Sequence, residues 1–152
     1  LQKAATEKDT KQVRDTAGAI LEQFPRTTFA PLAAMISARV HFESGDLKTA
    51  RAQLQWVIDR AAEPALQSIA KLRLANVLVD DEAAEEAIKL LDNAPAGEFA
   101  SQFAALKGDI LVSKGQKSEA RAAYKIAIDK VDAKNSAQKE RLQSKLDALG
   151  DA

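Results

Sequence analysis

The sequence contains no cysteine and only one histidine. Without cysteine the chain has no disulfide, no thiolate zinc site and no thiol nucleophile. A single histidine also leaves no His–His pair for a metal ion. We therefore predict neither a metal site, nor a cofactor, nor a catalytic residue from these residue types.

An excess of charge of one sign is also absent. The 152 residues include 22 basic and 22 acidic side chains, and the sequence pI is about 6.8. A neutral chain has no general attraction to phosphate backbones or anionic lipid. The basic residues form no stripe with interleaved aromatic side chains, so nucleic acid is not an expected partner.

Long apolar runs are missing as well, since none approaches the roughly 18–20 residues that a membrane span needs. The first residues, Leu1 to Ala5, resemble the middle of a helix. We therefore expect that a membrane anchor, if the protein has one, lies upstream of Leu1.

Helix-forming residues dominate what is present, and glycine and proline separate segments with helical periodicity. The pattern predicts an all-α protein. Gly45 and Gly115 are expected to end helices, whereas Asp9, Asp46 and Asn135 are expected to begin them. The predicted helices are 1–7, 10–24, 28–44, 47–61, 64–79, 82–94, 98–114, 117–131 and 136–149.

An acidic run, Asp80-Asp81-Glu82 with Glu85 and Glu86 after it, has two interpretations. We favour a helix N-terminus, where carboxylates stabilise the positive end of the dipole. A metal site is the weaker alternative, because no ring of other ligands accompanies the run.

The segment 31–62 aligns with 101–132, and a middle copy fits between them. Each copy has a small residue late in its first helix, an alanine early in its second helix and a bulky residue one turn later. Small residues let two helices approach closely, and the bulky residue fills the gap to the next repeat. The three triplets are Ala38, Ala50 and Leu54; Ala75, Ala87 and Leu91; Gly108, Ala120 and Tyr124.

A helix-turn-helix period near 34 residues is typical of the tetratricopeptide repeat family, which the chain therefore resembles. Glu82 stands where the middle copy should have its turn glycine. We predict a single tetratricopeptide-like solenoid of antiparallel hairpins over 1–152. Its parts are a partial repeat (1–24), three repeats (28–61, 64–94 and 98–131) and a C-terminal capping helix (136–149).

Several phrases, in this order, also resemble the YfgM-like bacterial proteins, which are ancillary subunits of the Sec translocon. They include Ala50–Gln55, Lys71–Val77, Leu106–Asp109 and Leu111–Lys117. The resemblance implies a domain on the periplasmic side of the inner membrane, with a single N-terminal anchor upstream. It also implies a non-enzymatic role with the Sec translocon, a membrane-anchored periplasmic chaperone of the prolyl-isomerase type and unfolded secreted clients.

In a solenoid of this kind, the first helix of each repeat lines a concave face. Helical register then predicts a protein-binding groove with an apolar floor and polar handles, suited to a partner helix or an extended segment. The alternative is that the apolar members belong to the core. The predicted groove residues are Met35, Arg39, Phe42, Ile69, Leu72, Asn76, Val79, Asp109 and Val112.

Two other functions compete with this one. A soluble tetratricopeptide scaffold for another multiprotein assembly keeps the fold and changes the partners. An enzyme is disfavoured, because the sequence has no phosphate-binding loop, nucleophile elbow or metal-ligand spacing. His41 is expected to fill a tyrosine position of its repeat rather than to act as a base, since no nucleophile accompanies it.

Overall fold

The structure is a computed structural model that describes residues 2–150, with side chains from Glu7 onward. Within this range it contains eight α-helices and no strand, which confirms the all-α prediction. The helices are α1 (Gln2–Gln23), α2 (Phe29–Glu43), α3 (Leu47–Arg60), α4 (Pro64–Asp80), α5 (Ala84–Asp92), α6 (Ala100–Ser113), α7 (Lys117–Lys130) and α8 (Ser136–Asp147).

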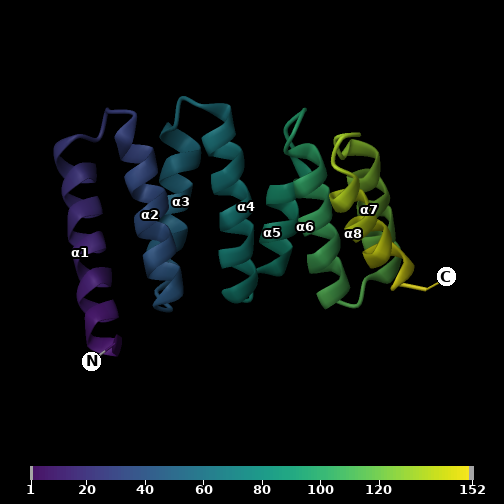
Figure 1. The fold of residues 1–152 in the computed structure, drawn as a ribbon, viewed down its shortest axis with the longest axis horizontal. Helices are drawn as coiled ribbons and strands as arrows, with labels where there is room; N and C mark the ends of the chain where they lie inside the picture. The colour runs from purple at the N-terminus through teal and green to yellow at the C-terminus, as the bar shows by residue number, and fades with distance from the viewer. Residues whose placement is uncertain (1, 151–152) are drawn as a thin grey trace. The chain divides into compact units, whose positions relative to one another are not determined.

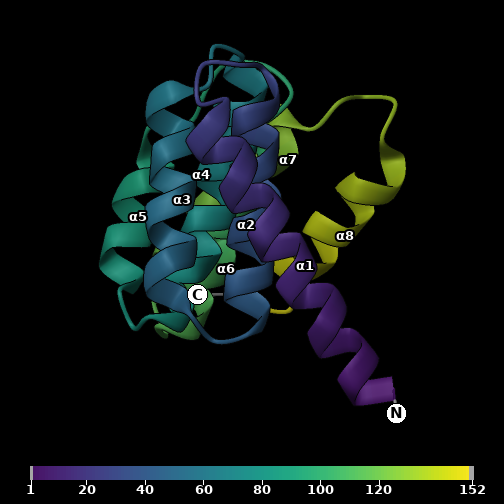
Figure 2. The same cartoon turned by 90° about the vertical axis from the view of Figure 1, so that its left-hand side faces the viewer.

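The chain forms two compact units, one ending at Asp81 and the other beginning at Glu82. In the first unit α1 packs on α2, α2 on α3 and α3 on α4, with a smaller contact between α2 and α4. In the second unit α6 packs on α5 and α7, and α7 packs on α8. Within each unit, neighbouring helices run in opposite directions (Figure 1). The N-terminal turns of α1 extend past the end of α2 (Figure 2).

The residues that define the repeat are buried in all three copies. Ala50, Ala87 and Ala120 are each 0% exposed. Their small and bulky partners in the three triplets are buried too. In the second unit, Ala120 belongs to one apolar cluster with Leu111 and Ala123. The spacing of small residues therefore identified core positions correctly.

The turn and cap predictions hold at most helix ends. Gly45 and Gly115 adopt positive φ angles of 82° and 74°, which a residue with a Cβ atom adopts only at a cost. Asp46 caps α3 by accepting a hydrogen bond from the Thr49 N–H at 3.1 Å. Asn135 caps α8 in the same way, accepting from the Gln138 N–H at 3.1 Å.

One predicted helix boundary is wrong. The expected break between 7 and 10 is absent, because α1 runs continuously through Asp9. The stretch around Asp9 contains neither glycine nor proline, so a capping residue alone was not enough to end a helix there.

The acidic run is also placed differently from the prediction. Asp80 is the last residue of α4 and Asp81 follows it, while only Glu85 and Glu86 lie in the first turn of α5. Glu82 adopts a positive φ of 58° in the turn, at the position where the other repeats have glycine. A non-glycine residue pays a steric cost in this conformation.

Candidate protein-binding site

A cavity of about 370 Å³ opens in the first unit between α2, α3 and α4, and we call it the α2–α4 cavity. Its lining combines an apolar floor with a charged and polar rim. It is lined by Ala38, Arg39, Phe42, Glu43, Leu54, Arg73, Asn76 and Val77.

The floor of the α2–α4 cavity follows from the repeat pattern. Ala38 is 1% exposed and lines the cavity together with Leu54 and Val77. Leu54 and Val77 are themselves buried, whereas Phe42 is half-buried and forms a wall. Because these side chains are fixed by packing, the floor is formed before any ligand arrives.

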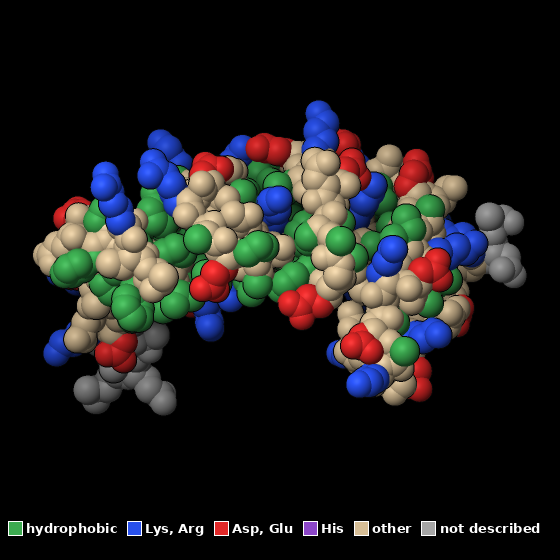
Figure 3. Space-filling model, turned by 90° about the horizontal axis from the view of Figure 1, so that it is seen from above, with side chains coloured by type: hydrophobic (Ala, Val, Ile, Leu, Met, Phe, Trp, Pro, Cys, Tyr) green, Lys and Arg blue, Asp and Glu red, His purple; other side chains and the backbone are tan. Residues whose placement is uncertain are grey.

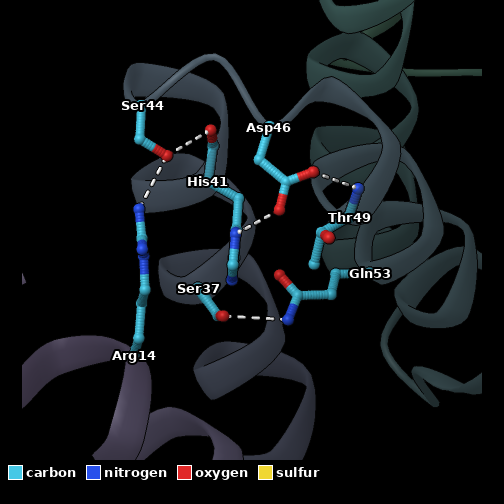
Figure 4. A network of polar contacts seen from close by, with 7 residues as sticks. All are labelled: Arg14, Ser37, His41, Ser44, Asp46, Thr49 and Gln53. Atoms are coloured by element: carbon cyan, nitrogen blue, oxygen red, sulfur yellow. Dashed lines mark hydrogen bonds and ion pairs between the residues drawn. The ribbon is translucent and has the colours of Figure 1, made fainter. Parts of the chain in front are cut away.

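A polar network fixes the turn that joins α2 to α3, the two helices on one side of the cavity (Figure 4). His41 Nδ1 lies 3.0 Å from Asp46 Oδ2, and Arg14 of α1 donates to the Ser44 hydroxyl at 2.7 Å. The hydrogen bond from Thr49, together with the smaller contribution of His41, lowers the pKa of Asp46. The imidazole of His41 is thus bonded to the residue that caps α3, which gives it a structural role in the turn.

A second contact ties α2 to α3 deeper in the first unit. Gln53 of α3 donates to the hydroxyl of Ser37, which is 2% exposed, at 2.8 Å (Figure 4). A polar bond in a buried position is directional, so it fixes the register of one helix on the other. The position of Arg39 and Phe42 on α2 relative to Leu54 on α3 is therefore well defined.

The rim of the cavity carries two guanidinium groups and one carboxylate. Arg39 Nε donates to Glu43 Oε1 at 2.7 Å, and this hydrogen bond raises the pKa of Arg39. Both side chains of the pair remain well exposed, at 72% and 57%. Arg73 makes no ion pair with any described residue, and the Asn76 amide donates to the Leu72 carbonyl at 3.2 Å.

The structure brings together three of the predicted groove residues, Arg39, Phe42 and Asn76, around this one cavity. Met35 is only 5% exposed and lies in the core, so it is not available to a ligand. The neighbouring Ile36 is 54% exposed instead. The other predicted residues of α4 are half-buried and do not line the cavity; they are Ile69, Leu72 and Val79.

The two remaining predicted residues belong to the second unit. Asp109 accepts a hydrogen bond from the Tyr124 hydroxyl at 2.6 Å and from Lys145 Nζ at 2.7 Å. Burial of the ring, and then the bond to Asp109, raise the pKa of Tyr124. Asp109 therefore joins α6, α7 and α8, whereas Val112 is 40% exposed.

Some residues around the cavity were not predicted from the sequence. Arg73 lies three residues before Asn76, so the same helical face would have identified it. The repeat pattern predicts only a packing role for Leu54 and no role for Val77. Both residues line the floor of the cavity. Phe29 and Ile36, at 69% and 54% exposure, are further exposed apolar side chains of α2.

A larger cavity of about 730 Å³ lies within the second unit, among α5, α6 and α7. Its walls are mostly alanine and aliphatic side chains. Its charged members include both signs, and Lys107 is already paired with Asp92 at 2.5 Å. Charged and polar residues make up a smaller share of this lining than of the lining of the α2–α4 cavity.

The described part of the chain contains neither a cluster of metal-ligating side chains nor a helix suited to crossing a membrane. Within it, no group of three or more His, Asp or Glu side chains could hold a metal ion. None of the helices between Gln2 and Asp147 has both the length and the apolar character to cross a bilayer. On the face seen in Figure 3, basic and acidic side chains are interspersed rather than segregated.

Comparison with known proteins gives a consistent result. The tetratricopeptide repeat-like domain family matches residues 1–151. The chain is 26% identical over 149 residues to a protein of Neisseria gonorrhoeae named ancillary SecYEG translocon subunit, covering 98% of this chain and 71% of that protein. It is 33% identical over 124 residues to the Escherichia coli protein of the same name, covering 82% of this chain and 59% of that protein.

A third relative with this name, from Haemophilus influenzae, is 30% identical over 111 residues. The chain spans between 54% and 71% of the lengths of the curated relatives that it matches.

Proposed function

The chain belongs to the tetratricopeptide repeat-like family, and we propose that it is a non-enzymatic binding subunit that works beside the Sec translocon. The observation that carries this proposal is its similarity, over 149 residues, to a protein named ancillary SecYEG translocon subunit. Homologues with this name match most of the chain, at 26–33% identity. Helical repeats of this family bury their small residues in the core and present side chains for binding, which fits such a role.

The structure supports a binding role more than a catalytic one. The α2–α4 cavity offers an apolar floor and a polar rim, the combination that peptide-binding sites use for affinity and specificity. Its charged groups are an arginine paired with a glutamate and a second arginine, with no activated nucleophile among them. The single histidine, His41, is half-buried and bonds to the helix cap Asp46.

The proposal extends to location and partners. We infer that the domain works on the periplasmic side of the bacterial inner membrane, held there by a single-pass anchor. Its partners would be the translocon itself, a membrane-anchored periplasmic chaperone of the prolyl-isomerase type, and unfolded secreted clients. The support for these partners is the likeness to the ancillary subunits, together with a cavity suited to short apolar segments.

Site-specific photo-crosslinking in bacterial cells tests this function. A photoreactive side chain is placed at Phe42 on the cavity wall and, in a second variant, at Lys125, an exposed residue of α7. We expect Phe42 to form crosslinks to translocon subunits, to a chaperone or to secreted chains. Crosslinks to these proteins only from Lys125 would show that the cavity is not the binding surface.

The alternative function is a soluble scaffold for another assembly, and the same experiment separates it. Mass spectrometry identifies the crosslinked partner. If Phe42 crosslinks to the subunits of an assembly unrelated to secretion, and never to translocon components, the scaffold function replaces the proposal.

A further inference from the structure

We propose that the larger cavity, in the second unit, binds an amphipathic helix of about three turns that belongs to a partner protein and lies antiparallel to α7. We call this cavity the α5–α7 groove. It is lined by Ile88 and Leu91 of α5, Ala104 and Leu111 of α6, and a stripe of α7 from Glu119 to Lys130. The inference goes beyond the proposed function, because the α2–α4 cavity belongs to the first unit.

The α5–α7 groove exists because α5 is short. This helix has nine residues, whereas α3 and α7 have 14 each. Its last residue, Asp92, pairs with Lys107, which lies seven positions after Ala100, the first residue of α6. About 10 Å of α6 therefore extends past the end of α5. Residues 93–99 pass this stretch without forming a helix, and the space that a longer α5 would fill is open.

The groove lies on the side of α6 that points away from the predicted groove residues Asp109 and Val112. At 100° per residue, the α6 residues that line it fall on one stripe, and Asp109 and Val112 fall on the opposite side of the helix. The stripe consists of Ala100, Ala104, Lys107 and Leu111. Two second helices of the repeats, α5 and α7, form its walls, so this surface is distinct from one formed by the first helices.

The floor of the groove is apolar and formed in advance. Leu91, Leu111 and Ala123 are only 2–4% exposed and are therefore fixed by packing. Ile126 of α7, which lines the groove above them, is 54% exposed. Covering this side chain with apolar atoms of a partner removes it from water, which favours association.

The walls are held at a fixed spacing. Two ion pairs tie α5 to α6, one between Glu85 and Lys114 and the other between Asp92 and Lys107. Between them, Ile88 of α5 packs on the apolar cluster that contains Leu111. A partner helix therefore meets a surface that needs no rearrangement, which lowers the entropic cost of binding.

Two opposite charges mark the ends of the groove along α7. Glu119 and Lys130 both line it, both are exposed, and neither has a hydrogen bond or ion pair with another described residue. An antiparallel partner helix would place an acidic residue of its first turn beside Lys130 and a basic residue of its last turn beside Glu119. Its own macrodipole favours the same order of charges. Charge complementarity therefore selects this partner and this orientation.

Two lengths agree on a partner of about three turns. Eleven positions separate Glu119 from Lys130, which corresponds to about 16 Å, or three turns of 5.4 Å. One turn about 10 Å across has a volume of roughly 420 Å³. If half of each turn enters the groove, its volume of about 730 Å³ also corresponds to about three turns. A single-chain amphiphile carries a charge at one end only and would leave one of the two groove charges unmatched.

Fluorescence polarisation tests the inference with the 152-residue chain and a labelled, alanine-rich helical peptide of about 16 residues. The peptide has a glutamate in its first turn, a lysine about 11 residues later and leucines between them on the same face. Its twin exchanges the glutamate and the lysine. A hydrocarbon staple on the opposite face keeps both peptides equally helical. We expect about 3–10-fold weaker binding by the twin. Equal binding of the two peptides would overturn the inference.

Three protein variants locate the binding surface. Ile126→Ser should weaken binding about 10-fold, because it removes the exposed aliphatic wall. Val112→Ser is the matched control, since Val112 is an exposed aliphatic residue on the other side of α6, and it should leave binding unchanged. The double variant Glu119→Lys with Lys130→Glu should bind the twin more tightly than the original peptide. An unaltered preference in the double variant, or equal losses for Ile126→Ser and Val112→Ser, contradicts the proposed site.

The remaining outcomes separate this inference from its competitors. If neither peptide binds and laurate binds in a manner that Ile126→Ser abolishes, the groove takes a single-chain lipid and the inference is wrong. Phe42 lies in the first unit, so its crosslinks report on the proposed function separately. Crosslinks from Phe42 without peptide binding would leave that function standing and refute the helix site, whereas peptide binding without crosslinks would do the reverse.

Discussion

The ring of Tyr124 lies against Gly108, so closely that a Cβ atom on Gly108 would come within 2.6 Å of the ring carbon Cε1. Glycine is therefore required where α6 crosses α7, because any side chain would collide with the ring. The same relationship explains how a buried tyrosine can replace the smaller bulky residues, Leu54 and Leu91, of the other two copies.

Gly108→Ala should lower the free energy of unfolding by about 1–3 kcal/mol, because the new methyl group forces the Tyr124 ring to move. Thermal unfolding followed by circular dichroism measures the change. The control is Gly18→Ala in α1, where a Cβ atom meets nothing within 4 Å. That variant should gain up to about 1 kcal/mol from helix propensity alone. Equal melting temperatures for the two variants would refute the close contact.

Ala120→Leu should also be destabilising, by about 1–3 kcal/mol, since Ala120 is fully buried against Leu111 and Ala123. The added atoms have no space at the crossing of α6 and α7. Chemical denaturation compares this variant with Ala122→Leu, an exposed position on the same helix. A parental midpoint for Ala120→Leu would show that the crossing can open at little cost.

Because of Tyr124, we expect the protein to lose stability at alkaline pH. Burial and the bond to Asp109 raise its pKa in the folded protein above the value near 10 of an unfolded chain. The folded state therefore holds this proton more tightly. The resulting stability is fully present below about pH 10 and is lost as the pH rises through the raised pKa.

Tyr124→Phe should remove that alkaline dependence. At neutral pH it should cost about 0.5–1.5 kcal/mol, because the hydrogen bond to Asp109 is gone while Lys145 still pairs with the carboxylate. Unfolding midpoints from pH 7 to 12 provide the measurement. A variant as sensitive to alkali as the parent would mean that other groups control the dependence.

The carboxyl group of Asp46 should make the stability of the protein depend on pH in the acid range, in the opposite direction from Tyr124. The hydrogen bond from Thr49 lowers the pKa of this carboxyl in the folded state, relative to about 3.9 when unfolded. Its contribution is thus present above about pH 4 and is lost as the pH falls through the lowered pKa.

Two substitutions at Asp46 separate the cap from the charge. Asp46→Asn keeps an acceptor for the Thr49 N–H, so its melting temperature should fall less steeply than the parent's between pH 5 and 2. Asp46→Ala removes the cap and should melt lower at every pH. If both variants retain the acid sensitivity of the parent, the charge of Asp46 does not contribute to it.

Glu82→Gly should stabilise the turn before α5, by about 1 kcal/mol, because glycine adopts the left-handed conformation without the Cβ penalty. The opposite change at an equivalent turn, Gly115→Ala, should be destabilising. Melting temperatures of the two variants should move in opposite directions. A lower melting temperature for Glu82→Gly would show that glycine's extra freedom in the unfolded chain outweighs the relief.

The sequence predicted the core of each repeat well, since burial of a small residue between two helices depends only on local spacing. Ala50, Ala87 and Ala120 illustrate this. The caps at Asp46 and Asn135 were predictable for the same reason, because the hydrogen bond spans three residues. The boundary at Asp9 was wrong because a cap motif inside a strong helical pattern competes with continued helix formation.

The candidate site was less predictable, because its residues depend on how each helix is rotated against its neighbours. Helical periodicity of 3.6 residues cannot separate Met35 from Ile36, yet the first is buried and the second exposed. Likewise, nothing near Asp109 in the sequence indicates that Lys145, 36 positions away, covers its carboxylate. Such assignments require the packed structure.

The packing of α2 on α1 and α3, and of α7 on α6 and α8, has a kinetic consequence. Contacts between helices that follow one another require only short loops to close, so little chain entropy is lost before stabilising contacts form. Domains rich in such local contacts fold on the order of microseconds to milliseconds. The helices of a newly made chain of this kind can therefore pack on one another while later residues are still emerging.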